Sequence, residues 1–323
     1  MKIIKPYYVE EITAVTEKIK EEKYDFLFAV AADSHLDNSL EELVTNISQV
    51  DKLVNFNCLV HLGDFLNGNI PKKHTEEILK SQITMYKNAI NKKFYPVQGN
   101  HDGYCDNIFY QAADMAVDDD WYAATEFVSE YENVCRVKPK PYYYADYPDI
   151  KFRLIILCSF SYVMDKENFT KIYGPDDEQI RWLKKEALNV DETWTILIFS
   201  HDTPFEEFDD GRCKTDTSKY NGQLLMDTIL WEKNKRQFDI AGWFAGHYHG
   251  DYIGKIRGIN FILTGSQTAY VPQLWKMPPG GNFAARTLDT VNEDLWDSVL
   301  INKKEHKIKI IRFGAGEDRS IEY

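Results

Sequence analysis

The sequence lacks several features that would assign it to a membrane or secretory class. None of its 323 residues belong to an apolar run of the roughly 18 residues that a transmembrane helix needs. No apolar stretch of signal-peptide type follows the opening Met1–Pro6 segment. We therefore expect a cytoplasmic protein with no membrane partner.

Positive charge is also scarce. Lys and Arg number 38 against 51 Asp and Glu, which gives a net charge of −13. Such a surface opposes non-specific binding to nucleic acid, so we expect no nucleic-acid partner. The charge does not exclude a small phosphate ester as substrate, because bound metal cations dominate the field inside a site.

Cysteine is sparse and odd in number, with irregular spacing. The five are Cys58, Cys105, Cys135, Cys158 and Cys213. Cys58 and Cys158 lie in apolar, strand-like runs, and free thiols in a reducing compartment are the simplest interpretation. The alternative is a pair between Cys105 and Cys135, which flank one polar stretch.

The remaining composition, 44% hydrophobic and 14% aromatic, supports a sizeable core. Apolar runs alternate with amphipathic segments, which favours parallel strands covered by helices. We predict strands at 25–32, 57–62, 94–98, 193–199 and 238–245, and helices at 7–24, 39–53, 74–92, 176–188 and 222–235. Hairpins are expected at 142–158, 251–264 and 297–313. No linker interrupts the pattern, so we expect a single domain over 1–323, with insertions near 103–140 and 265–295.

Five short polar motifs each follow an apolar run, at the place where a strand would end. They are Asp33-Ser34-His35, Gly63-Asp64, Gly99-Asn100-His101-Asp102, Ser200-His201 and Gly246-His247-Tyr248-His249. Open α/β sheets keep their ligands at such strand ends. In the last motif we expect Gly246 to permit a sharp turn. Two loop histidines are the alternative for that motif alone, but five of the eight histidines fall in the set. Carboxylate, amide and imidazole groups from five strand ends indicate a two-metal site.

In this order, the motifs resemble those of the calcineurin-like metallophosphoesterases. The resemblance runs from Asp33 to His249 and so covers most of the chain. It implies an α/β fold of four layers, an α/β/β/α sandwich of two mixed sheets. We expect the hairpins at 251–264 and 297–313 to belong to the second sheet.

The resemblance also implies the ligands of two transition-metal ions, divalent or trivalent, of Mn, Fe or Zn. One ion takes Asp33, His35, Asp64 and His249, and the other takes Asp64, Asn100, His201 and His247. Asp64 would bridge the two, because its two oxygens can hold cations about 3.5–4 Å apart.

The implied activity is hydrolysis of a phosphoester by a metal-bridging hydroxide. His101 is not a ligand in the family pattern, and we expect it to face the substrate as general acid or as a stabiliser of the transition state. Asp102 either fixes the tautomer of His101 or caps the turn. A small phosphodiester is the first choice of substrate. Alternatives are a phosphomonoesterase, a protein phosphatase or a catalytically silent metal-binding module.

Other polar and aromatic residues have plainer interpretations. We expect His61 to pack in the core and His74 and His306 to lie at the surface. The acidic run Asp118–Asp120 forms a solvated turn or binds a cation. Three residues of the long loop after the motifs either contact substrate or pack, namely Tyr270, Trp275 and Arg286.

Overall fold

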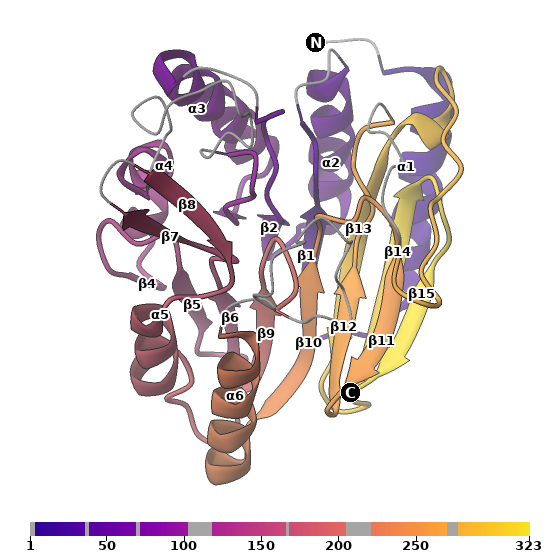
Figure 1. Ribbon diagram of the computed structural model, residues 1–323. Coiled ribbons are helices and arrows are strands. Elements are labelled where there is room, and N and C mark those ends of the chain that lie inside the picture. The colour runs from indigo at the N-terminus through magenta and orange to yellow at the C-terminus, as the bar shows by residue number, and fades with distance from the viewer. Residues whose placement is uncertain are drawn as a thin grey trace.

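The computed structural model describes residues 4–35, 39–68, 72–102, 118–165, 168–204, 221–269 and 277–323. Two large mixed sheets lie face to face, and helices cover their outer faces (Figure 1). Three buried clusters separate the layers, one beneath each helical layer and one between the sheets. The predicted four-layer α/β/β/α sandwich is therefore confirmed, whereas the single domain with insertions stays a prediction.

The first sheet has six strands in the order β15-β14-β13-β1-β2-β3. Its parallel half contains β1 (Phe26–Ala31), β2 (Cys58–His61) and β3 (Lys93–Pro96). Its antiparallel half contains β13 (Leu295–Asn302), β14 (Lys307–Gly314) and β15 (Arg319–Glu322).

The second sheet has seven strands in the order β11-β12-β10-β9-β6-β5-β4. Its parallel centre contains β6 (Phe152–Ile156), β9 (Thr195–Phe199), β10 (Asp239–Ala245) and β12 (Ile259–Leu263). The antiparallel edges are β4 (Val134–Arg136), β5 (Tyr143–Tyr147) and β11 (Tyr252–Ile256). A separate ribbon pairs β7 (Phe160–Asp165) with β8 (Asn168–Tyr173).

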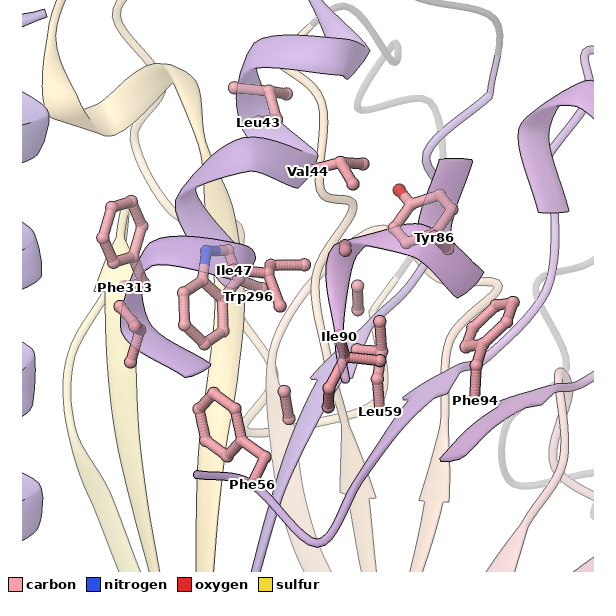
Figure 2. Close-up of a cluster of buried hydrophobic side chains, with 14 of the residues drawn as sticks. Leu43, Val44, Ile47, Phe56, Leu59, Tyr86, Ile90, Phe94, Trp296 and Phe313 are labelled. Carbon is pink, nitrogen blue, oxygen red and sulfur yellow. The ribbon is translucent and has the colours of Figure 1, made fainter. Parts of the chain in front are cut away.

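Helices pack on both outer faces. On the first sheet lie α1 (Pro6–Glu21), α2 (Leu40–Val54), α3 (Lys72–Ala89) and α4 (Asp118–Ala124). On the second sheet lie α5 (Asp177–Trp182), the π-helical turn η3 (Leu183–Ala187) and α6 (Gly222–Arg236). Short 3-10 turns are η2 (Glu126–Glu130) and η5 (Val291–Glu293). Figure 2 shows how Leu43 and Ile47 of α2 and Tyr86 of α3 pack toward Leu59 and Trp296 of the first sheet.

Strand β1 shows why the sheets must be covered on both sides. Leu27, Ala29 and Ala31 face the helices, while alternate residues, Phe26 and Phe28 among them, face the second sheet. Successive side chains point to opposite faces of a strand, so a strand that is apolar throughout is buried on both faces. All six residues of β1 are buried.

The expectation that both C-terminal hairpins belong to the second sheet is right for one of them and wrong for the other. Residues 251–264 form β11 and β12 of the second sheet, as predicted. The hairpin at 297–313 is β13 and β14, and it joins the first sheet instead, where β13 pairs antiparallel with β1. The strand pattern is apolar on both faces and fits either sheet, so the sequence could not show which edge was free.

No helix within the described residues is both long and apolar enough to cross a bilayer.

Candidate metal centre

The fold brings the five motifs together at the ends of β1, β2, β3, β9 and β10. Asp33, His35, Asp64 and His249 form one group whose ligand atoms all lie within 4.8 Å of one another. His35 Nε2 lies 3.4 Å from His249 Nε2, and the latter lies 3.6 Å from Asp33 Oδ1. These are the four residues expected around the first ion.

A second group shares Asp64 with the first. Asp64, His201 and His247 offer ligand atoms within the same 4.8 Å limit. The amide oxygen of Asn100 lies 2.9 Å from His201 Nε2 and 2.9 Å from His247 Nδ1. All seven expected ligands are therefore adjacent, and Asp64 lies between the two groups.

The donor set fits two transition-metal ions. Ring nitrogens lie close together, since His247 Nδ1 is 3.2 Å from His201 Nε2. The carboxylates of Asp33 and Asp64 are buried among them. Buried carboxylates and neutral imidazoles that converge on one point are typical of sites for Zn, Fe or Mn. The chemistry of these residues therefore fits the ions that the motifs predict.

The site attracts positive charge through Asp64. Burial alone would raise the pKa of Asp64, but the neighbouring imidazoles of His201 and His101 hold it well below its usual range. The pKa of His201 is raised to about 9, because the Asp64 carboxylate outweighs the burial that would lower it. Asp64 is therefore ionised at neutral pH, the form that binds a cation.

The other ligands are deeply desolvated. Burial raises the pKa of Asp33 well above its usual range, and it lowers the pKa of His35 and of His249. Neutral imidazoles are the form that binds metal, so these histidines need lose no proton at neutral pH.

The ligand-bearing turns adopt unusual backbone conformations. Asp33, His35, Asp64, His247 and His249 all have φ between 47° and 69°, in the left-handed region. Non-glycine residues in this region cost roughly 1–3 kcal/mol each and occur where surrounding structure holds them. The sharp turn thus falls on the histidines themselves rather than on Gly246.

Gly246 and Gly99 serve a different purpose, which is close approach. A Cβ at Gly246 would lie 2.6 Å from Asp33 Oδ2, and one at Gly99 would lie 2.1 Å from the Asp64 nitrogen. Asp33 in turn accepts a 2.9 Å hydrogen bond from the backbone N–H of His247. The two glycines therefore let separate motifs touch.

The carboxylate of Asp102 is buried beside the metal centre and accepts hydrogen bonds from backbone N–H groups. Its carboxylate accepts hydrogen bonds from the N–H groups of Asp64 (2.9 Å), Phe65 (2.6 Å), Leu66 (3.2 Å) and Gly99 (2.8 Å). Both oxygens are occupied in this way. This geometry favours the capping alternative for Asp102 over contact with the ring of its neighbour His101.

His101 occupies the rim. Its backbone N–H donates to Asp64 Oδ1 over 2.8 Å, and its Nε2 lies 3.8 Å from Asp64 Oδ2. The side chain is 24% exposed, whereas that of His201 is fully buried. The ring packs against Gly68, where a Cβ would lie 2.0 Å from Nδ1. His101 is thus held beside the bridging carboxylate while still reaching solvent.

The other histidines, the acidic run and the loop residue Arg286 singled out in the sequence lie outside the two ligand groups. His61 is fully buried and stacks on Phe65, while His74 and His306 are exposed, as expected. Asp118–Asp120 form the first turn of α4. Arg286 donates to the carbonyls of Ser266, Gln267, Asn292 and Glu293, which is the packing role. Tyr270 and Trp275 lie outside the described residues.

Two parts of the chain contact the metal centre without having been predicted from the sequence. The β7–β8 ribbon places Phe160 with its ring centroid 5.9 Å from that of His201, and Tyr173 6.2 Å from that of His247. The alternating apolar residues on either side of 165–168 could have indicated this hairpin. Ser266 is the second contributor, and its hydroxyl donates to the carbonyl of Asp33 over 2.7 Å. No sequence signal marks it.

Residues 26–251 match the family described as calcineurin-like phosphoesterase. A dimetal phosphatase from Danio rerio is similar in structure, with a TM-score of 0.60 and 14% identity over 93% of this chain and 100% of that one. A purple acid phosphatase from seeds of yellow lupin (Lupinus luteus) has a TM-score of 0.55 and 12% identity over 92% of this chain and 53% of that one. No curated protein matches the sequence. These identities show likeness of fold, and the match over most of the chain shows that this protein belongs to the calcineurin-like phosphoesterase family.

Proposed function

We propose that this protein is a metal-dependent hydrolase of phosphoesters that holds two transition-metal ions of Mn, Fe or Zn. The observation that carries the proposal is the pair of ligand groups that share Asp64. One group would hold an ion through Asp33, His35 and His249 besides Asp64. The other would use Asn100, His201 and His247.

Two such ions, when bound, polarise phosphate oxygens and lower the pKa of water so that hydroxide is available near neutral pH. The protein's own residues supply orientation and proton transfer. Asp102 fixes the backbone of Asp64 and Gly99, and so sets the position of the shared carboxylate. His101, at the exposed rim, is the side chain we assign to the proton that the leaving oxygen requires.

A small phosphodiester is the substrate class we favour. Two divalent cations and the two aspartates leave a site of modest positive charge, which suits a monoanion. Within the described residues, no Arg or Lys side chain pairs with Asp33, Asp64 or His101, whereas dianionic phosphate is commonly held by an arginine fork. The net charge of −13 also opposes a nucleic-acid substrate. Among the described residues, the thiols of Cys58, Cys135 and Cys158 are free, which supports our proposal of a cytoplasmic location; Cys105, the alternative partner of Cys135, lies outside the described residues.

The test compares two chromogenic esters that share a leaving group. Purified protein loaded with Mn²⁺ is assayed on bis(p-nitrophenyl) phosphate and on p-nitrophenyl phosphate, with metal content measured by elemental analysis. We expect about two ions per chain and a higher kcat/KM on the diester. Asp64→Ala should lose both metal and activity, because the shared ligand disappears. Two ions without turnover on either ester would indicate a silent metal-binding module, and a preference for the monoester would reverse the substrate assignment.

A further inference from the structure

Four charged side chains form a buried cluster next to the ligand turn. The Arg–Asp cluster comprises Asp251, Asp297, Arg312 and Arg319, with two positive and two negative groups. Arg312 donates to Asp251 over 2.7 and 2.9 Å and to Asp297 over 2.8 Å. Arg319 donates to Asp251 over 3.2 Å and also to Asp297. Arg312 is 2% exposed and Asp297 1% exposed, so these pairs are shielded from water.

The cluster joins the two sheets. Asp297, Arg312 and Arg319 lie on β13, β14 and β15 of the first sheet. Asp251 comes immediately before β11 of the second sheet and two residues after His249. The three partners lie beyond residue 251, where the match to the family ends. C-terminal strands therefore hold the end of a ligand-bearing turn.

Among the residues that the structure describes, the ring of His249 lacks the hydrogen bond that orients the rings of two other ligand histidines, so the position of its backbone matters more. The second ring nitrogen of a ligating histidine usually donates to a fixed acceptor, which orients the ring. Nδ1 of His35 lies 2.9 Å from the carbonyl of Leu66, and Nδ1 of His201 lies 2.8 Å from that of Leu62. Within the described part of the chain, Nδ1 of His249 has no hydrogen-bond partner although it is buried. Its orientation therefore depends on its backbone.

The backbone after His249 is held from two directions. Asp251 exchanges two main-chain hydrogen bonds with Asn282, of 2.8 and 2.9 Å, while its carboxylate binds Arg312 and Arg319. The same carboxylate accepts from the N–H of Gly265 over 3.2 Å. His249 itself has φ of 55°, a conformation that needs outside support.

We propose that the Arg–Asp cluster is a positioning device for the metal centre, with Arg312 as its principal residue. By fixing Asp251, it holds His249 in line with Asp33, His35 and Asp64. The proposal rests on the proposed function, because it assumes that His249 binds metal. Arg312 touches no ligand directly, so its effect must appear in the affinity of one ion rather than in the chemistry.

The test measures metal affinity apart from turnover. Arg312→Gln is titrated with Mn²⁺ by isothermal calorimetry beside the parent protein, with folding checked by circular dichroism. We expect the dissociation constant of one ion to rise by roughly 10–100-fold, the usual effect of removing a group that orients a ligand. The second ion should bind nearly as before. Crystals grown with one equivalent of Mn²⁺ should show by anomalous scattering that the retained ion lies at His201 and His247.

Arg153→Gln is the matched control. Arg153 is also buried, and it binds Asp146 through two hydrogen bonds of 2.6 and 2.7 Å in the second sheet. Both substitutions should lower thermal stability, but only Arg312→Gln should weaken metal binding. Arg312→Lys retains the charge without the planar fork and should recover part of the affinity.

The outcomes separate the two proposals. If the parent protein binds no Mn²⁺, the proposed function fails. If it binds two ions and Arg312→Gln binds both with unchanged affinity, or if Arg153→Gln weakens an ion equally, the positioning role is overturned. Should Arg312→Gln fail to fold, Arg319→Gln replaces it, because that side chain is 14% exposed and makes fewer contacts. It should weaken the same ion to a smaller degree, and an unchanged affinity would again refute the role.

Discussion

Replacement of Asp102 tests how the shared ligand Asp64 is held. In Asp102→Ala, four buried backbone N–H groups lose their acceptor, those of Asp64, Phe65, Leu66 and Gly99. A hydrogen bond to a charged group contributes about 1.5–3 kcal/mol, and a buried donor left unpaired costs about 1–3 kcal/mol. The four bonds share one carboxylate and are not additive. We therefore expect a loss of about 3–5 kcal/mol, a large part of the usual 5–15 kcal/mol of a folded protein.

The assay is urea unfolding of metal-free protein, followed by metal titration of the folded variant. Asp102→Ala should lower the unfolding midpoint and also weaken metal binding, because Asp64 and Asn100 flank the released turn. Asp102→Asn keeps one acceptor oxygen and should lose roughly half as much stability.

Asp51→Ala is the control, since the buried Asp51 carboxylate also accepts backbone N–H groups, from Phe56 and Asn91, but belongs to α2. It should cost stability without affecting metal binding. A loss below about 1 kcal/mol in Asp102→Ala, with metal affinity intact and activity reduced, would refute the capping role. That result would favour a role through His101 instead.

Three further predictions concern other parts of the molecule. Gly99→Ala should abolish metal binding, because the new Cβ would lie 2.2 Å from Asp64 Oδ1. Elemental analysis measures the metal content. The control is Gly258→Ala, which should leave metal binding intact because nothing lies within 4 Å of its Cβ position. Burial raises the pKa of Asp294 to about 7, so between about pH 4 and 7 the folded state keeps a proton that the unfolded state has lost. Stability should fall as pH rises through this window, and Asp294→Asn should flatten the change in urea midpoint; an unaltered slope would contradict the assignment. His101→Ala should keep its metal while kcat falls roughly 10²–10⁴-fold on alkyl esters and less on p-nitrophenyl esters. Loss of a metal ion would make His101 a ligand.

The sequence was informative about which groups meet, because strand ends follow from local patterns. Each ligand follows an apolar run that is long enough to be a strand, and parallel strands end at the same edge. This rule groups His35 with Asp64, which follow neighbouring strands of the first sheet, whereas His249 follows β10 of the second sheet and is joined to them only by the family resemblance. The ligand atoms of the three residues lie within 4.8 Å of one another.

Contacts between segments that are far apart in the sequence are harder to predict. The family resemblance predicts that the hairpin at 297–313 belongs to the second sheet, but Leu300 pairs with Leu27 of β1 in the first. Both alternatives bury the same apolar residues, so periodicity could not distinguish them. Arg312 and Asp251 are 61 positions apart and belong to different sheets, and no motif joins them. Local sequence does not determine the role of Asp102 for the same reason, since its partners Phe65 and Leu66 come from another strand end.

The backbone conformations of the ligands explain why the motifs predict which residues bind metal but not which residues hold them in place. Five of the seven ligands have left-handed φ angles, at roughly 1–3 kcal/mol each, so their combined cost is comparable with the 5–15 kcal/mol of net stability of a typical domain. Local sequence cannot offset such a cost, because asparagine or glycine would adopt these angles more easily than histidine. The compensation comes from distant groups, such as Asp102 under Asp64 and Ser266 under Asp33. The chemistry of metal binding selects the side chains of the motifs, and the tertiary structure must then hold backbone that those side chains disfavour. A protein that kept every motif residue but lost these supports would still match the pattern, and we expect it to bind metal poorly.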